Sequence, residues 1–213
     1  MYIILLILSG ESVFILPYVL ARVFRPTFLD VFQLTNFQLG SLFSVYGIVA
    51  LLSYLYGGVI ADKFLPRKLM SLSLFLTALG GLVLAVFPSY IVLQILFGYW
   101  GFTTVFLFWG AMIKATRLWG GSVSQGKAFG ILDGGRGLVA ASMGIIGVFI
   151  FSLILTTDIK SATLIERQEA FRYVILFSSL IVALVGVLVF FFMRIKGEEE
   201  LKGLASTNSV ANI

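Results

Sequence analysis

The chain of 213 residues contains no histidine and no cysteine. Disulfide frameworks, Cys/His zinc sites, c-type haem attachment and Ser-His or Cys-His nucleophilic catalysis each require a residue type that is missing. No pair of nucleophile and base therefore points to a hydrolase or a synthase. We expect a protein that is not an enzyme and that holds neither a metal ion nor a cofactor.

Charged residues are scarce as well. Only 12% of the residues are charged and 60% are apolar, with a mean hydropathy of +1.07. Because about a quarter of the residues of a soluble domain are charged, this composition indicates a membrane protein, and the lipid bilayer is its first expected partner. The net charge is +5, but Lys and Arg lie in short gaps between apolar runs. That is the pattern of membrane topology, so we expect no nucleic-acid partner.

Uncharged stretches predict where the chain crosses the membrane, because a helix needs about 20 apolar residues to span the hydrocarbon core. The 45 uncharged residues between Lys68 and Lys114 have room for two helices, and Pro88 and Ser89 mark a turn near their middle. Other uncharged stretches hold one span each. The fold class predicted is an all-α, polytopic membrane protein with a six-helix bundle over 1–193 and spans at about 2–24, 39–61, 69–87, 90–113, 128–156 and 173–193.

The basic residues predict the orientation. Nine of the 15 fall on one side of the membrane, five fall on the other, and Arg136 lies inside the fifth span. The side with nine is expected to be cytoplasmic. We therefore expect a multi-pass protein of the cell inner (plasma) membrane with both termini in the cytoplasm. Residues 194–213 lose the apolar pattern and are interpreted as a cytoplasmic tail that begins a central loop.

One short turn carries a recognisable motif. It lies between the second and third predicted spans and contains Gly58, Asp62, Lys63, Arg67 and Lys68. Their spacing resembles the signature Gly-x-x-x-Asp-Arg/Lys-x-Gly-x-Arg/Lys-Arg/Lys of the major facilitator superfamily, which occurs at the same place. Leu65 stands where that signature has its second glycine. The resemblance implies a gating motif that helps to hold the outward-facing state closed on the cytoplasmic side.

Further segments narrow the resemblance. They are 16–18, 34–40, 87–90, 109–114 and 129–137, and they are similar to bacterial permeases of the organophosphate:phosphate antiporter or nitrate/nitrite-transporter-like group. Such proteins have twelve helices in two halves around a central cavity. The resemblance implies that this chain is the N-terminal half of a secondary active, alternating-access permease for a small organic or phosphorylated anion, either proton-coupled or exchanging substrates.

That resemblance also implies a fragment whose expected partner is the missing C-terminal half. Two alternatives stay open. One is a six-helix protein that pairs with a second copy of itself as a homodimeric half-transporter. The other is a membrane scaffold that does not transport.

Charges at membrane depth are costly and are therefore the first candidates for substrate binding. Glu11, Tyr18 and Arg22 follow spacings that place them within about 20° of one line along a helix. In the resembling family an arginine of the first helix binds the substrate phosphate, which implies this role for Arg22 next to Tyr18. Arg25 is a second candidate, and Arg22 could instead be a snorkelling residue at the membrane surface.

The fifth predicted span also carries charge. Asp133 and Arg136 lie three residues apart, and counting from Lys127 places Arg136 roughly 14 Å deep, similar to Glu11. We predict that Arg136 pairs with Glu11, Asp133 or both, since a paired buried charge costs less than a lone one. The pair is either a fixed lock between helices or a part of proton or substrate coupling, and Arg136 is also a substrate-binding candidate.

The fourth predicted span ends in two basic residues. Lys114 lies about 36 Å along the helix from Tyr90, which places it and Arg117 at the cytoplasmic boundary. We interpret Lys114 and Arg117 as a cytoplasmic gate or topology anchors rather than deep ligands. Trp109 is interpreted as a packing or aromatic-belt residue.

Overall fold

The computed structural model describes residues 1–155 and 161–194, and these residues form helices and no strand. Six of the helical stretches found there are long and apolar enough to cross a membrane, in agreement with the all-α, six-span prediction. The expected tail beyond Arg194 and residue 156 of the fifth predicted span lie outside the described residues. The stretches are Tyr2–Val23, Asn36–Lys63, Pro66–Leu84, Tyr90–Gly120, Gln125–Ile154 and Leu164–Phe192.

Local hydrogen bonds determine where two of these helices begin. At helix α4 (Asn36–Lys63), the Thr35 backbone N–H donates to Gln38 Oε1 at 2.8 Å and the Gln38 N–H donates to Thr35 Oγ1 at 3.2 Å. Thr163 and Glu166 form the same capping box at α9 (Leu164–Phe192). Both helices therefore start before the predicted spans. Counting uncharged residues finds the part of a helix that crosses the membrane, but it does not find the helix ends.

Two of the spans contain π-helical segments that the sequence pattern did not predict. The first span consists of α1 (Tyr2–Phe14), η1 (Ile15–Val19) and α2 (Leu20–Val23). Pro17 lies within η1, and proline lacks the N–H that an α-helix interior needs. A short helix that was also not predicted, α3 (Arg25–Val31), follows.

The fourth span consists of α6 (Tyr90–Gly101), η2 (Phe102–Trp109) and α7 (Gly110–Gly120). It continues beyond the predicted end at residue 113, so Lys114 and Arg117 lie within a helix and not in a loop. Gly121, with φ of 62°, ends α7 in a conformation that favours glycine.

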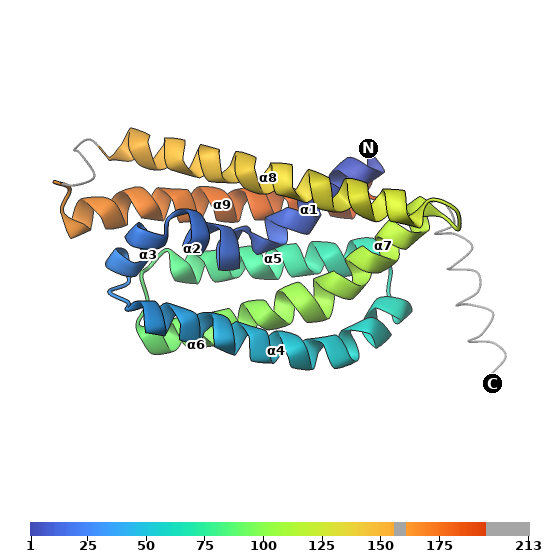
Figure 1. The fold of residues 1–213 in the computed structure, drawn as a ribbon, viewed down its shortest axis with the longest axis horizontal. Helices are drawn as coiled ribbons and strands as arrows, with labels where there is room; N and C mark the ends of the chain where they lie inside the picture. Colours follow the sequence, from blue (N-terminus) through green and yellow to red (C-terminus); the bar gives the residue numbers. More distant parts are fainter. Residues whose placement is uncertain (156–160, 195–213) are drawn as a thin grey trace.

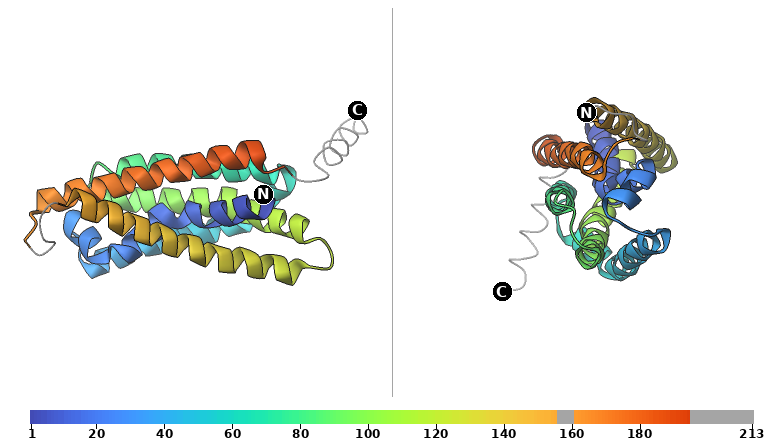
Figure 2. Two further views of the ribbon diagram at one scale, coloured as in Figure 1. Left: turned by 90° about the horizontal axis from the view of Figure 1, so that it is seen from above. Right: turned by 90° about the vertical axis from the view of Figure 1, so that its left-hand side faces the viewer.

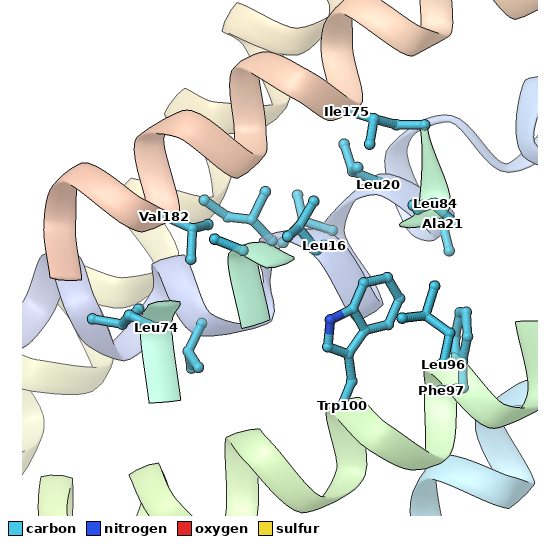
Figure 3. Close-up of a cluster of buried hydrophobic side chains, with 14 of the residues drawn as sticks. Leu16, Leu20, Ala21, Leu74, Leu84, Leu96, Phe97, Trp100, Ile175 and Val182 are labelled. Atoms are coloured by element: carbon cyan, nitrogen blue, oxygen red, sulfur yellow. The ribbon is translucent and has the colours of Figure 1, made fainter. Parts of the chain in front are cut away.

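The core lies between the first, third, fourth and sixth spans. Helix α5 (Pro66–Leu84) packs along α9, and α1 contacts α8 (Gln125–Ile154) and α9 (Figure 1). Figure 3 shows Leu16, Trp100 and Val182 in one fully buried cluster that joins η1, α6 and α9. The Trp100 indole N–H donates to the Thr77 carbonyl at 3.1 Å, which satisfies the polar atom of this large side chain.

Two helices are much less covered than the others. In the most apolar part of α4 and α8 only 22% and 17% of the residues are buried, against 44–61% in the other four spans. Viewed along the bundle, α4 and α8 lie at opposite edges (Figure 2, right). The basic residues of the α4–α5 and α7–α8 turns lie together at one end, on the right in Figure 1, which we call the basic end.

Candidate functional site

A cavity of about 410 Å³, which we call the central cavity, opens between the first span and α8. The sequence-predicted residues Glu11, Tyr18, Arg22, Asp133 and Arg136 all line it. Phe14, Gly137 and Ala140 complete the lining. Residues that are more than 100 positions apart in the sequence therefore meet at one place, in an arrangement that can bind a small charged molecule.

Arg136 forms the centre of a three-membered charge cluster. Its Nε lies 3.4 Å from Glu11 Oε2, and its Nη1 lies 3.3 Å from Asp133 Oδ1. The side chains of Arg136 and Glu11 are 18% and 13% exposed, whereas that of Asp133 is 67% exposed. Because both carboxylates approach one guanidinium, the charges offset one another, and the Glu11 contact joins α1 to α8.

Small residues allow α1 and α8 to come this close. A Cβ atom at Gly135 would lie 2.7 Å from Ile7 Cδ1, and one at Gly10 would lie 3.1 Å from Arg136 Cδ. Side chains at these positions would push the helices apart or displace the arginine. Gly135 therefore acts in helix contact, whereas Gly130, Gly134 and Gly137 have no neighbouring atom within 4 Å of such a Cβ.

Two aromatic rings that were not predicted to belong to the site also contact the guanidinium. Arg136 Cζ lies 5.5 Å from the centroid of the Phe14 ring and 5.7 Å from that of Trp109. Both distances are within the range of cation–π attraction. Phe14 lies three residues from Glu11, so helical spacing could have found it. Trp109 is the last residue of the π-helical η2, so a pattern of 3.6 residues per turn could not place it.

Tyr18 belongs to an aromatic cluster between the first span and α4. Its ring stacks on Phe43 with 5.2 Å between centroids and meets Tyr46 edge to face at 4.8 Å. The Tyr46 hydroxyl is 2.5 Å from Thr104 Oγ1, so the cluster extends to η2. Tyr18 therefore presents a fixed aromatic wall to the cavity.

Arg22 and Arg25, the two arginine candidates after the first span, have different surroundings. Arg25 Nη2 donates to Asn36 Oδ1 at 2.8 Å and does not line the central cavity. Arg22 is exposed, lines the cavity and lies within electrostatic range of Glu11. In the part of the chain that the structure describes, no hydrogen bond or ion pair engages Arg22. Arg22 is thus the arginine better placed to meet an incoming anion.

The basic end holds a second cavity of about 500 Å³ between α4 and the η2–α7 helix. Gly58, Asp62, Lys114 and Arg117 are among its lining residues. Lys114 Nζ donates to the carbonyl oxygens of Ala61 at 2.8 Å and of Asp62 at 3.1 Å. This contact places a positive charge at the C-terminal end of α4, where the helix dipole favours it.

The other residues of the predicted gating motif lie away from this cavity. Arg67 Nη1 donates to the Phe190 carbonyl of α9 at 3.2 Å. Lys63 and Lys68 are exposed at the two sides of the α4–α5 turn. The motif thus divides into residues that line the second cavity and an arginine that contacts the sixth span.

Comparison with known proteins gives a consistent result. Residues 3–210 match the family described as Major Facilitator Superfamily. The chain is 30% identical over 185 residues to Inner membrane protein YqcE of Escherichia coli K12. The aligned region covers 87% of this chain and 41% of that protein. It is 31% identical over 194 residues to Inner membrane protein YihN of the same strain, with 91% and 44% covered. The chain thus spans less than half the length of these relatives. No solved structure matched it.

Proposed function

The chain belongs to the major facilitator superfamily, a family of membrane transporters, and we propose that it forms the N-terminal half of a secondary active permease for a small organic or phosphorylated anion. The observation that carries this proposal is the exposed guanidinium of Arg22 in the central cavity, which has no hydrogen-bond or ion-pair partner among the described residues. A guanidinium matches the geometry of a carboxylate or phosphate through two parallel hydrogen bonds. The proposed orientation has the basic end and both termini in the cytoplasm.

The other lining residues supply the remaining parts of such a site. Arg22 attracts the anion first, and the rings of Phe14 and Tyr18 give an apolar wall for the rest of the substrate. Arg136 is already matched by Glu11 and Asp133. A substrate anion that reaches Arg136 therefore competes with a carboxylate for it.

This competition provides a way to couple transport to a second ion. When the substrate takes over Arg136, Glu11 loses its partner and needs another counter-charge, which a proton can supply. The alternative is that the Glu11–Arg136 pair only locks α1 to α8. The two roles differ in their pH dependence, because only coupling requires Glu11 to exchange a proton.

We further propose that the transporting unit contains a second six-helix half, organised as in the organophosphate:phosphate antiporter and nitrate/nitrite-transporter-like group. Two observations support this: the relatives are more than twice as long as the matched part, and α4 and α8 are the least covered helices. The second half would pack on these two edges and close the central cavity. Rocking of the halves would then expose the cavity to each side in turn.

The gating motif would regulate this rocking. Asp62 and Gly58 line the second cavity, on the surface of α4 that the second half would approach. Lys114 ties the end of α4 to α7, so the two helices would move together. Substitution of Asp62 is therefore expected to change the rate of interconversion and not the choice of substrate.

Uptake into proteoliposomes tests the proposed function. The full-length protein would be assayed with a panel of labelled small anions, including inorganic phosphate, phosphate monoesters and carboxylates. Arg22→Gln is expected to reduce uptake by about 100-fold, since it removes a charge-assisted bidentate contact. Arg25→Gln is the matched control, because Arg25 contacts Asn36 outside the cavity. Equal uptake by the wild type and Arg22→Gln would contradict the proposal.

A further inference from the structure

Trp109 connects the two cavities of the bundle. It is the last residue of η2, and its side chain lines the second cavity at the basic end. Arg136 lines the central cavity, yet its Cζ lies 5.7 Å from the centroid of the Trp109 ring. The Trp109 side chain therefore contacts both the second cavity and the charge cluster of the central cavity.

The backbone next to Trp109 is held closely against α4. A Cβ atom at Gly110 would lie 3.0 Å from Ala61 Cβ and 3.3 Å from the Gly57 carbonyl oxygen. The Trp109 ring also meets Tyr54 of α4 edge to face, with 6.4 Å between centroids. The position of the indole is thus set by the contact between α4 and the fourth span.

The carboxylates alone hold the Arg136 guanidinium loosely. Its distances to Glu11 and Asp133 are 3.4 Å and 3.3 Å, whereas a charge-assisted hydrogen bond measures about 2.7–2.9 Å. The buried Nε atom of Arg136 makes no hydrogen bond. Phe14 and Trp109, which pack edge to face at 6.1 Å, also contact the guanidinium. Its position therefore depends on these rings as well as on the carboxylates.

We propose that Trp109 is a positioning residue that holds the Arg136 guanidinium in place for the substrate anion. The inference rests on the proposed anion site.

The first experiment measures how well Arg136 is held, without any ligand. Phenylglyoxal modifies arginine, and mass spectrometry gives the labelling rate of each arginine in the purified full-length protein. Trp109→Leu is expected to raise the rate at Arg136 about threefold or more, and Trp109→Phe, which keeps a ring, to stay near the wild type. Trp119→Leu, on exposed Trp119 of the same span, is the matched control. Trp109→Met has a similar volume without a ring and a more adaptable side chain, and it replaces Trp109→Leu if that variant does not fold.

The second experiment adds inorganic phosphate as the probe. Phosphate is expected to slow the labelling of Arg22 and Arg136 in the wild type, and about fivefold more phosphate is expected to be needed in the ringless variant. Trp109→Phe should restore the wild-type requirement.

The outcomes separate the inference from the proposed function. Equal labelling rates at Arg136 in the wild type and the ringless variants, with phosphate protecting all of them alike, would overturn the positioning role of Trp109. If phosphate protects neither arginine in the wild type while the ringless variant still accelerates labelling at Arg136, the anion site is wrong and the hold of Trp109 on Arg136 stands.

Discussion

The polar contacts in the middle of the bundle differ from those at the end opposite the basic end. At that end Arg167 Nη1 lies 2.8 Å from Asp30 Oδ2, and Arg167 Nη2 donates to the Ala162 carbonyl at 2.9 Å. Gln168 donates to the Val31 carbonyl at 3.0 Å, and Arg172 donates to the Ala85 carbonyl at 3.1 Å. These short bonds join α9 to α3 and to the end of α5. We call this group the end clasp.

In the central cavity the distances between charged groups are longer, and one arginine has no hydrogen-bond partner among the described residues. Arg136 meets its two carboxylates at 3.3–3.4 Å, and Arg22 beside them has no hydrogen-bond partner among the described residues. The short contacts of the clasp hold the ends of helices together, although Asp30 Oδ2 and Arg167 Nε make no hydrogen bond there. The longer contacts beside the cavity can be exchanged for a ligand. The comparison predicts that substitutions in the cavity affect transport and that substitutions in the clasp affect stability.

The largest effect is expected at Arg136. Arg136→Met removes the cation that Glu11 and Asp133 share, so uptake is expected to fall by about 100-fold or more. The measurement is initial uptake rate in proteoliposomes, normalised to the amount of folded protein. Lys127→Met, at the exposed start of α8, is the control. Wild-type uptake by Arg136→Met would contradict the claim that substitutions in the cavity affect transport and those in the clasp affect stability.

An intermediate effect is expected at Glu11. Glu11→Gln keeps the size of the side chain but cannot exchange a proton, so uptake is expected to drop about tenfold and to lose most of its dependence on pH. Rates measured from pH 5.5 to 8.5 in the wild type and the variant test this. An unchanged pH profile in Glu11→Gln would assign the pair to helix locking alone.

The smallest effect on transport is expected in the clasp. Arg167→Gln removes the ion pair to Asp30, whose two side chains are partly exposed at 29% and 41%. The expected cost is about 1 kcal/mol of stability after screening by solvent, with uptake within about twofold of the wild type. Thermal unfolding in detergent and uptake would be measured on the same preparation. A large loss of uptake without a loss of stability would place the clasp in the transport mechanism.

The charge cluster of the central cavity could be predicted from the sequence. Glu11, Asp133 and Arg136 could be assigned to one depth and one partner set because residue counting along straight helices places charges well, and hydrocarbon leaves few charges to choose from. The six spans could be predicted because apolar stretches separated by charged turns are read directly from the sequence. The gating role of the motif in the α4–α5 turn stays a prediction.

Only part of the aromatic lining could be predicted. Tyr18 was placed on one line with Glu11 and Arg22, and all three line the central cavity. Trp109 lies at the end of η2, and a π-helical turn shifts residues relative to the 3.6-residue pattern, so that pattern did not place Trp109 against Arg136. The early start of α9 was missed because its first turns carry charges that serve in the capping box and in the clasp.

The most direct test of the central claim is a binding measurement on the purified full-length protein. Isothermal titration with inorganic phosphate and with the best-transported anion would be carried out on the wild type, Arg22→Gln and Arg25→Gln. The account predicts binding by the wild type, binding at least about tenfold weaker in Arg22→Gln, and unchanged binding in Arg25→Gln. Binding of equal strength in Arg22→Gln and the wild type, or a loss confined to Arg25→Gln, would contradict the assignment of the central cavity as the anion site.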